Sequence, residues 1–326
     1  MIDIKDLQFI GQDLKRPECV LMDCHGSLHI ADWNGGVTVI SKDIRKRTIL
    51  AKCSFALKPN GIAILANKSW LVTHLGDSDG GVYYLKEDGE LIPYLLELDK
   101  APLPPTNYVH IDHLSRVWIT VSTRLVPRIL GCRSDHSDGF IILVDKKGPR
   151  IVADNLGYTN ECCVEPKTNR LYVNETFGRR LTCFDINDNG SLRNKQTIFE
   201  FGFGDFPDGI NFDVKGGVWI TSIVSNRVIR ITPDKKAEII IEDSDEQHLN
   251  WVEDAYLGSR LKRAHLDKAS GKALKNVSSL AFGGPDMKIG YLGCLQGQTI
   301  ATFKSKIAGV KPPHWHPRSF DEIKFK

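Results

Sequence analysis

The sequence lacks long hydrophobic runs, basic blocks and paired-cysteine motifs. No stretch of its 326 residues approaches 18 uninterrupted apolar residues, so we expect no membrane span. Lys and Arg number 43 against 40 Asp and Glu, and this balance without a basic run argues against nucleic acid as a partner. The eight cysteines form no CxxC pair, which predicts reduced core residues rather than a thiolate zinc site.

The N-terminus also lacks the features of a secretory leader. Residues 1–12 alternate acidic and apolar residues, with no basic region followed by an apolar one. We therefore expect a cytoplasmic protein. The apolar fraction of 41% is enough to bury a sizeable core at this length, while the oligomeric state stays open.

Short β-branched and aromatic runs recur between Gly, Asp and Asn, whereas helical periodicity is scarce. Six segments share one order: an apolar strand, a polar turn, a strand of the Val-Trp-Ile-Thr type, a second turn and a third strand. Most of them follow each other at the roughly 40–50 residues typical of a four-stranded blade. The segments begin at Pro17, Pro59, Thr106, Thr159, Pro207 and Val277.

Six such repeats predict an all-β fold, a six-bladed β-propeller of four-stranded antiparallel blades. Radial closure leaves only short strand edges exposed, which an open array of sheets could not achieve. We interpret residues 1–326 as a single domain, with a polar insertion over about residues 244–275 that contains a short helix and lies on a rim. Residues 2–10 are predicted to add an outer strand to the last blade and so lock the ring.

Each repeat begins with an oxygen-bearing side chain at nearly the same distance before its second strand. The first strand of a propeller blade lines the central channel, so these side chains should point at one place on the axis. Asn and Asp also begin strands because they satisfy turn backbone, but the shared register favours a site. The six residues are Glu18, Asn60, Asn107, Asn160, Asp208 and Ser279.

Two carboxylates among several amides on one axis would repel or stay unsatisfied without a cation. Oxygen donors without Cys or His suit Ca²⁺, Mg²⁺ or Mn²⁺, and Zn²⁺ also accepts carboxylates. We predict one divalent metal cation held by Glu18, Asn160 and Asp208. Asn107 is predicted to lie on the metal or near it.

Four motifs at these positions resemble the SMP-30/gluconolactonase/luciferin-regenerating-enzyme family. They are RPEC around Glu18, TNEC around Asn160, FPDG around Asp208 and AFGGPD at residues 281–286, and the resemblance runs in order over nearly the whole chain. It implies a six-bladed propeller, a channel metal on those three residues, and Asn107 as a substrate or metal contact. It also implies hydrolysis of lactones, usually sugar lactones.

The chain departs from the family where its sugar lactonases often carry Arg-x-Asn-Asp-Gly. Pro105 stands in place of the sugar-contacting Arg, and Tyr108 in place of the Asp beside Asn107. One strand later, this chain has Arg124 where those enzymes often carry an acidic residue. The metal set is thus kept while the substrate wall differs, which argues against gluconolactone itself as the substrate.

Three further residues just beyond the second strands are predicted to contact substrate: Arg124, His74 and Glu175. Arg124 would anchor an anionic group. The alternatives are structural, namely a salt bridge to a neighbouring blade for Arg124 and a purely structural role for the other two. Asn60 and Ser279 are predicted to support the ligands without touching the cation.

The sequence therefore predicts a divalent-metal-dependent hydrolase that opens a small-molecule lactone. The cation would polarise the carbonyl, and Asp208 would be the base that activates water; in the competing scheme Asp208 only orients a metal-bound hydroxide. The alternative function is a non-catalytic propeller scaffold that binds a protein partner and holds a structural metal. Carboxylates occupy only two of the six equivalent positions, as expected for a metal with open coordination sites. This asymmetry favours the enzyme over the scaffold.

Overall fold

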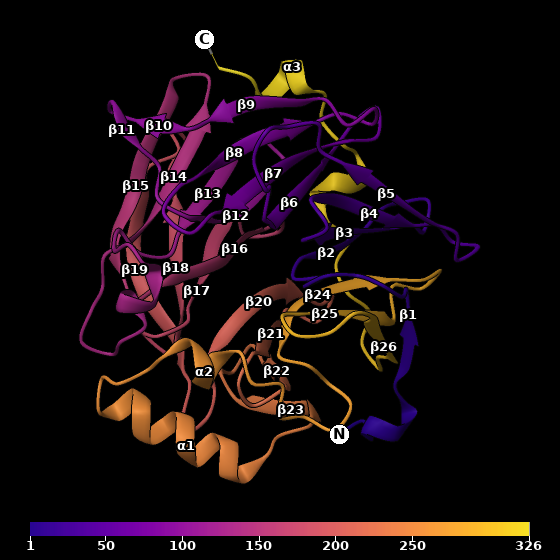
Figure 1. Cartoon of the computed structure of the whole chain (residues 1–326), viewed down its shortest axis with the longest axis vertical. Coiled ribbons are helices and arrows are strands. Elements are labelled where there is room, and N and C mark those ends of the chain that lie inside the picture. Colours follow the sequence, from indigo (N-terminus) through magenta and orange to yellow (C-terminus); the bar gives the residue numbers. More distant parts are fainter. Residues whose placement is uncertain (326) are drawn as a thin grey trace.

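Six four-stranded antiparallel sheets surround a central channel in the computed structural model, which describes residues 1–325 (Figure 1). The predicted six-bladed propeller is confirmed. In each blade the chain runs outward from the axis, and the innermost strands contact one another around the ring.

Blades 1 to 5 each use four consecutive strands, paired in sequence order. The strands are, blade by blade, β2 (Val20–Met22), β3 (Leu28–Asp32), β4 (Gly36–Ile40) and β5 (Lys46–Leu50); β6 (Pro59–Leu65), β7 (Ser69–Leu75), β8 (Gly80–Leu85) and β9 (Leu91–Leu95); β12 (Thr106–Ile111), β13 (Val117–Val121), β14 (Gly139–Asp145) and β15 (Gly148–Leu156); β16 (Thr159–Glu165), β17 (Arg170–Glu175), β18 (Arg180–Ile186) and β19 (Leu192–Glu200); and β20 (Pro207–Phe212), β21 (Val218–Ser222), β22 (Arg227–Ile231) and β23 (Ala237–Glu242). A small hairpin, β10 (Glu97–Leu98) and β11 (Ala101–Pro102), follows blade 2.

Blade 6 is completed by a strand from the N-terminus. β24 (Val277–Gly283), β25 (Ile289–Cys294) and β26 (Ile300–Lys304) pair in order, and β1 (Gln8–Ile10) adds antiparallel beside β26. The prediction that the first residues close the ring is confirmed. Separating blade 6 from blade 1 therefore also requires breaking the pairing between β1 and β26.

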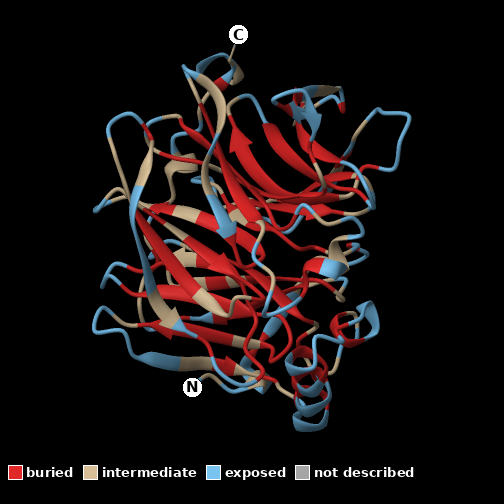
Figure 2. Ribbon diagram, turned by 90° about the vertical axis from the view of Figure 1, so that its left-hand side faces the viewer, coloured by how far each residue is buried: buried red, intermediate tan, exposed pale blue. Residues whose placement is uncertain are grey.

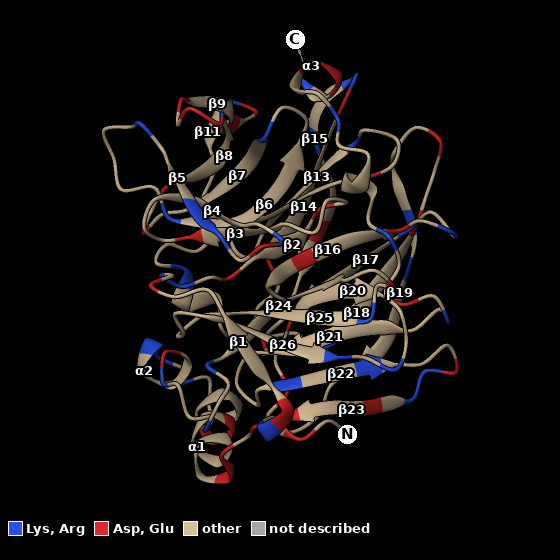
Figure 3. Cartoon of the chain, turned by 90° about the vertical axis from the view of Figure 1, so that its right-hand side faces the viewer, with Lys and Arg blue, Asp and Glu red and all other residues tan. Residues whose placement is uncertain are grey.

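Burial falls from the axis to the rim (Figure 2). Strands β6 and β24 are buried along their whole length, whereas β5 is mostly exposed. Apolar side chains fill the spaces between blades, and Trp70, Trp118 and Trp219 are at most 1% exposed. Charged residues of both signs are interspersed, mainly in turns and outer strands (Figure 3). Each pair of neighbouring blades shares a buried apolar cluster, so these contacts are continuous around the ring and support the channel walls.

The insertion of residues 244–275 forms two helices outside the blades, α1 (Glu246–Leu257) and α2 (Arg263–Leu266) (Figure 1). Val252 and Tyr256 of α1 pack against Phe177, and the Tyr256 hydroxyl donates to the Phe177 carbonyl at 2.7 Å. The insertion is thus seated on the loops that follow the second strands. No helix within residues 1–325 is both long and apolar enough to span a membrane.

The remaining helices are short, and two of them lie in the C-terminal segment. They are η1 (Ile4–Asp6), η2 (Arg128–Gly131), η3 (Pro313–Trp315) and α3 (Phe320–Ile323). The His314 ring bonds the Met22 carbonyl at 2.9 Å, and the Val310 N–H donates to the Phe212 carbonyl at 2.9 Å. Met22 and Phe212 end the innermost strands of blades 1 and 5, so this segment crosses the channel at the C-terminal ends of those strands.

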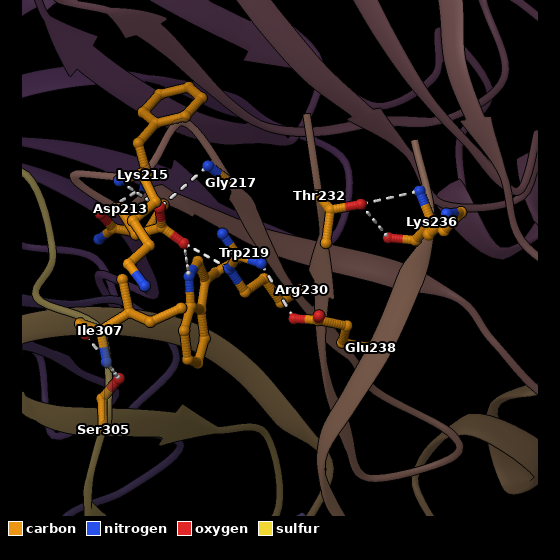
Figure 4. Close-up of polar contacts among 12 residues, drawn as sticks. Asp213, Lys215, Gly217, Trp219, Arg230, Thr232, Lys236, Glu238, Ser305 and Ile307 are labelled. Carbon is orange, nitrogen blue, oxygen red and sulfur yellow. Dashed lines mark hydrogen bonds and ion pairs between the residues drawn. The ribbon is translucent and has the colours of Figure 1, made fainter. Parts of the chain in front are cut away.

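A buried aspartate secures the turn between the first two strands of blade 5. The Asp213 carboxylate accepts hydrogen bonds from the Trp219 indole at 2.8 Å and from Arg230 Nε at 2.6 Å (Figure 4). It also accepts from the backbone N–H groups of Lys215 and Gly217. One side chain therefore joins the turn, the second strand and the third strand.

The same arrangement recurs in two other blades. Asp112 accepts from the Trp118 indole at 2.9 Å, and Asp23 contacts the His29 ring at 3.1 Å. In each case the aromatic residue follows the aspartate by six positions, as Trp219 follows Asp213. This contact between an aspartate and an aromatic residue is a feature of the blade repeat and not of the channel site.

We expect Asp213→Asn to destabilise the protein by about 3–5 kcal/mol, because it removes the charge paired with the buried Arg230. Burial raises the pKa of Asp213, but the bonds from Arg230, Gly217 and Trp219 outweigh it and leave the folded pKa below its usual value. The ionised group therefore stabilises the fold above the unfolded pKa of about 4, and this contribution is lost as pH falls through the folded pKa.

Denaturant unfolding at pH 7 and at stepwise lower pH tests this expectation. The stability gap between the parent protein and Asp213→Asn should close on acidification. The control is Asp234→Asn, an exposed aspartate of the same blade that pairs with Lys236, and it should change stability little. A gap that stayed constant down to pH 3 would contradict the role given to Asp213.

Candidate functional site

The six side chains predicted to face the axis all lie at the N-terminal ends of the innermost strands. Each is buried, with between 2% and 6% of its surface exposed. The C-terminal segment crosses the opposite ends of these strands, so the two ends of the channel differ. The six residues are Glu18, Asn60, Asn107, Asn160, Asp208 and Ser279.

Breaks in strand pairing accompany the site positions. The pairing of β12 with β13 steps from Thr106 to Tyr108, which leaves Asn107 outside the ladder. The pairing of β20 with β21 steps from Pro207 to Ile210 and leaves out Asp208. A residue in such a bulge escapes the normal alternation of side chains, so it can be aimed along a new direction. Blades 2 and 4 have equivalent breaks around Asn60 and Asn160.

Side chains of the preceding blade hold the backbone of these bulged residues. Thr73 of blade 2 donates its hydroxyl to the Asn107 carbonyl of blade 3 at 2.8 Å. Asn174 of blade 4 donates its amide to the Asp208 carbonyl of blade 5 at 2.9 Å. Both bonds are buried, and each site residue is therefore fixed by its neighbouring blade as well as its own.

The two positions predicted to support the ligands make contacts that favour such a role. Asn60 donates its amide to the Asn107 carbonyl at 3.0 Å. The Ser279 hydroxyl accepts the Val20 N–H at 3.3 Å, two residues beyond Glu18. Neither Asn60 nor Ser279 lines the cavity described next.

The other four residues line one small cavity of about 30 Å³. They are Glu18, Asn107, Asn160 and Asp208, from blades 1, 3, 4 and 5. A volume of this size admits an ion or a few water molecules at most. The register of the repeats thus brings together the four residues that the sequence analysis assigned to the metal.

Several oxygens in this cavity lack partners within residues 1–325. Asn107 Oδ1 and Asn160 Oδ1 are buried without a hydrogen bond. The Asn160 amide nitrogen donates to Thr176 Oγ1 at 3.0 Å, which leaves its oxygen as the free atom. Leaving a buried acceptor unpaired costs about 1–3 kcal/mol, so a ligand that satisfies these oxygens would be strongly favoured.

Two buried carboxylates at the site, Asp208 and the neighbouring Glu161, have raised pKa values. Burial raises the pKa of Asp208 well above its usual range, and the charges of Glu18 and Glu161 raise it further, while Arg16 and Arg128 oppose this rise. Burial likewise raises the pKa of Glu161 to about 8, although the Ile210 N–H donates to its carboxylate at 3.0 Å. A cation beside Asp208 would remove this strain.

The donor set fits a hard divalent cation. Two carboxylates and two free amide oxygens, supplied by four blades, are the ligands that Ca²⁺, Mg²⁺ and Mn²⁺ prefer. Across residues 1–325, no group of three or more His, Cys, Asp or Glu side chains is arranged to hold a metal. The carboxylate and amide cluster is the candidate metal site of the described residues.

Three arginines that the sequence analysis did not single out also line the cavity. Arg16 pairs with Glu18 through Nε and Oε2 at 3.0 Å. Arg128 comes from η2, and Arg263 begins α2 in the insertion. Arg16 could have been noticed, since it opens the RPEC motif, whereas the other two lie in segments that no repeat register aligns. Glu161, beside Asn160, was likewise missed.

Arg124 lies away from this cavity. Its guanidinium pairs with the Asp154 carboxylate at 2.8 and 2.9 Å, and its backbone N–H donates to Asp138. Asp154 belongs to β15 of the same blade. The structure therefore shows the salt-bridge alternative, made within blade 3 rather than to a neighbouring blade, and the substrate role of Arg124 stays a prediction.

His74 and Glu175 are also outside the cavity wall. The His74 ring accepts the Lys58 N–H at 3.1 Å, and burial lowers its pKa, so the ring is neutral near pH 7. Glu175 is fully buried and bonds Arg180 at 2.6 Å and the Gly157 N–H at 2.5 Å. These contacts favour structural roles, and the predicted substrate contacts stay untested.

Comparison with known sequences decides the family. The profile described as SMP-30/Gluconolactonase/LRE-like region matches residues 48–247. The chain belongs to this family. The matched region contains Asn107, Asn160 and Asp208, while Glu18 and blade 6 lie outside it.

Known proteins similar to this chain include two named as lactonases and one named as a calcium-binding protein. A 6-deoxy-6-sulfogluconolactonase of Pseudomonas putida is 26% identical over 190 residues, a match that spans 55% of this chain and 57% of that protein. A gluconolactonase from Xanthomonas campestris superimposes with a TM-score of 0.67 at 16% identity, covering 93% of this chain and 89% of that one. The calcium-binding protein regucalcin from Agrobacterium tumefaciens gives 0.66 at 16%, covering 94% and 97%. At these identities the two structures share the fold.

We expect Ca²⁺, Mg²⁺, Mn²⁺ or Zn²⁺ to raise the melting temperature of chelator-treated protein, and Glu18→Gln or Asp208→Asn to abolish that rise. A ligand at about 100 times its Kd adds about 2.7 kcal/mol to stability, which thermal scanning detects as a shift of several degrees.

The control for this experiment is Asp243→Asn. Asp243 is a buried carboxylate outside the cavity that accepts the Ala273 and Leu274 N–H groups at 2.7 Å. Its substitution should lower the melting temperature yet keep the metal-dependent rise. If Glu18→Gln and Asp208→Asn both kept the full rise, the cation would bind elsewhere.

Proposed function

We propose that this protein is a divalent-metal-dependent lactonase that opens a sugar-derived or related lactone. The observation that carries the proposal is the cavity shared by Glu18, Asn107, Asn160 and Asp208, with its two unpartnered amide oxygens. The names of the lactonase relatives support the same reaction class. These names indicate a small-molecule lactone as the substrate.

Glu18, Asn160 and Asp208 would hold the cation, with Asn107 beside it. Ca²⁺, Mg²⁺, Mn²⁺ and Zn²⁺ all accept this donor set, and the calcium named for the regucalcin neighbour makes Ca²⁺ the first ion to try. When bound, the ion would act as a Lewis acid on the lactone carbonyl oxygen, an effect worth several kcal/mol.

Asp208 is the proposed general base. Its carboxylate accepts no hydrogen bond from the protein within residues 1–325, so its oxygens stay available to a water molecule. Asp208 would take a proton from the water that attacks the carbonyl carbon. The ring C–O bond then breaks, and the proton passes to the departing alkoxide oxygen. One water is consumed, and the hydroxy acid formed releases a proton to neutral solution.

We expect chelator-treated protein to regain hydrolysis on addition of one of the four metals. Proton release from a panel of aldonolactones and aliphatic lactones measures the reaction. If no proton release is detected with any metal or any lactone while the protein remains folded, the lactonase proposal is contradicted. The non-catalytic scaffold is then the better account.

We further expect Asp208→Ala to lower kcat/KM by about 10²–10⁴-fold, the usual contribution of a general base, with little loss of melting temperature. The small thermal effect is expected because the parent side chain is a buried carboxylate with a raised pKa. Asp188→Ala, at an exposed turn of blade 4, serves as the control. Activity of Asp208→Ala within about tenfold of the parent would exclude Asp208 as the base.

A further inference from the structure

The metal-side cavity adjoins a much larger cleft. The cleft has a volume of about 420 Å³ and lies between blade 1 and the insertion. Both hollows share the same boundary, formed by Arg16, Arg263, Asp267 and Leu295. The boundary therefore joins an inner hollow that can hold an ion and an outer one that can hold an organic molecule.

The two hollows differ in size, so a lactone would place different parts of itself in each of them. The inner cavity of about 30 Å³ cannot enclose a sugar ring, whereas small-molecule sites commonly measure roughly 300–1,000 Å³. The body of a lactone must therefore lie in the cleft, with its carbonyl directed inward past the boundary. Groups at the boundary then meet the substituents of the ring.

Arg16 is the most buried charge at this boundary. Its side chain is 9% exposed, and its Nε is engaged by Glu18. Within residues 1–325 its two terminal nitrogens make no hydrogen bond. The central guanidinium carbon lies 4.6 Å from the centroid of the Trp33 ring, a cation–π contact that helps to hold it in place. A buried, oriented guanidinium with free donors is suited to a bidentate anion.

Arg128 and Arg263 add charge around the same hollow. Arg128 has no salt bridge within the described chain, and its nearest polar partner is the Tyr158 hydroxyl at 3.5 Å. Arg263 pairs with Asp267 through Nε at 3.0 Å and also through one terminal nitrogen, which leaves only its other terminal nitrogen free. Guanidinium groups outnumber the carboxylates that are free to neutralise them, since Glu18 and Asp208 are assigned to the cation.

The formal charges around the whole inner cavity also favour an anionic ligand. Its wall carries three arginines and three carboxylates, so it is formally neutral before a cation binds. A divalent cation leaves two formal positive charges beside the substrate. Lys15 on the cleft wall adds a further cation. An anionic ligand would be attracted to this wall, and a neutral one would leave its charges uncompensated.

The cleft also offers a surface for a ring with hydroxyl groups. The Trp33 ring lines it, and Gln296 and Gln298 supply amides. The Trp33 Nε1–H is buried without an acceptor in residues 1–325. An aromatic face with amide donors beside an arginine cluster matches a polyhydroxylated molecule with one acidic group.

We infer that the cleft selects lactones carrying an acidic substituent, a carboxylate, phosphate or sulfonate, and that Arg16, Arg128 and Arg263 bind that group at the boundary. The inference rests on the proposed lactonase function. It assigns the anion-binding role to arginines that line the cavity and keep a free terminal nitrogen, in place of Arg124, whose two terminal nitrogens are both engaged by Asp154.

Two measurements test the inference. In the first, kcat/KM is compared between neutral gluconolactone and gluconolactones bearing a 6-carboxylate, 6-phosphate or 6-sulfonate. In the second, calorimetry compares the affinity of the metal-loaded protein for glucose with that for glucuronate, glucose 6-phosphate and glucose 6-sulfate. These sugars cannot be hydrolysed as lactones, so the second measurement reports binding alone.

We expect the acidic probes to be preferred by at least about tenfold, and Arg128→Gln or Arg263→Gln to reduce that preference by about 10- to 100-fold, the value of one charge-assisted hydrogen bond. Arg128→Lys should restore part of it. The matched controls are Arg133→Gln and Arg260→Gln, exposed arginines paired with Asp135 and Asp254 that line neither hollow. They should leave the preference unchanged.

The outcomes separate the two proposals. Equal use of neutral and acidic probes, with lactones still hydrolysed, would overturn the inference and leave the lactonase standing. Selective binding of acidic sugars without hydrolysis of any lactone would overturn the lactonase and keep the anion site. Loss of selectivity in Arg124→Gln, but not in Arg128→Gln or Arg263→Gln, would return the role to Arg124.

Discussion

The site depends on hydrogen bonds that pass from one blade to the backbone of the next. Thr73 holds Asn107, Asn174 holds Asp208, and Ser278 donates to the Glu18 carbonyl at 2.8 Å. These bonds join blade 2 to blade 3, blade 4 to blade 5 and blade 6 to blade 1, so the backbone of each of the three residues is held by two blades. β1 completes blade 6, the blade whose Ser278 holds the Glu18 carbonyl.

This constraint explains how the fold tolerates costly groups at its axis. Asn107 and Asn160 keep unpaired buried oxygens, and Asp208 keeps a raised pKa, at positions where relaxation would break bonds between blades. The surrounding apolar interfaces supply the stability that the axis lacks. Strain of this kind is often found at ligand sites, and the proposed cation has the charge and donor preference that match these atoms.

The repeat made the fold and the shared axial position of the six polar residues predictable, because one register aligned six blades and their first residues. Glu18 and Asp208 could be found by counting back from the second strands. The bulges that aim Asn107 and Asp208 left no signal in the pattern, since the strands around them remain apolar. The salt bridge of Arg124 to Asp154 could not be predicted, because its partner lies thirty positions later and spacing does not assign it.

Arg128 and Arg263 were missed for a related reason. They come from a loop after the second strand of blade 3 and from the insertion, which have no counterpart in the other blades. The axial polar residues are positioned by the symmetry of the repeat, whereas the outer wall of the cavity is built partly by segments that break it. Sequence periodicity can therefore locate the polar cluster at the axis of such a propeller. Under the proposed function, the choice of substrate would depend on these irregular segments, whose placement only the folded chain reveals.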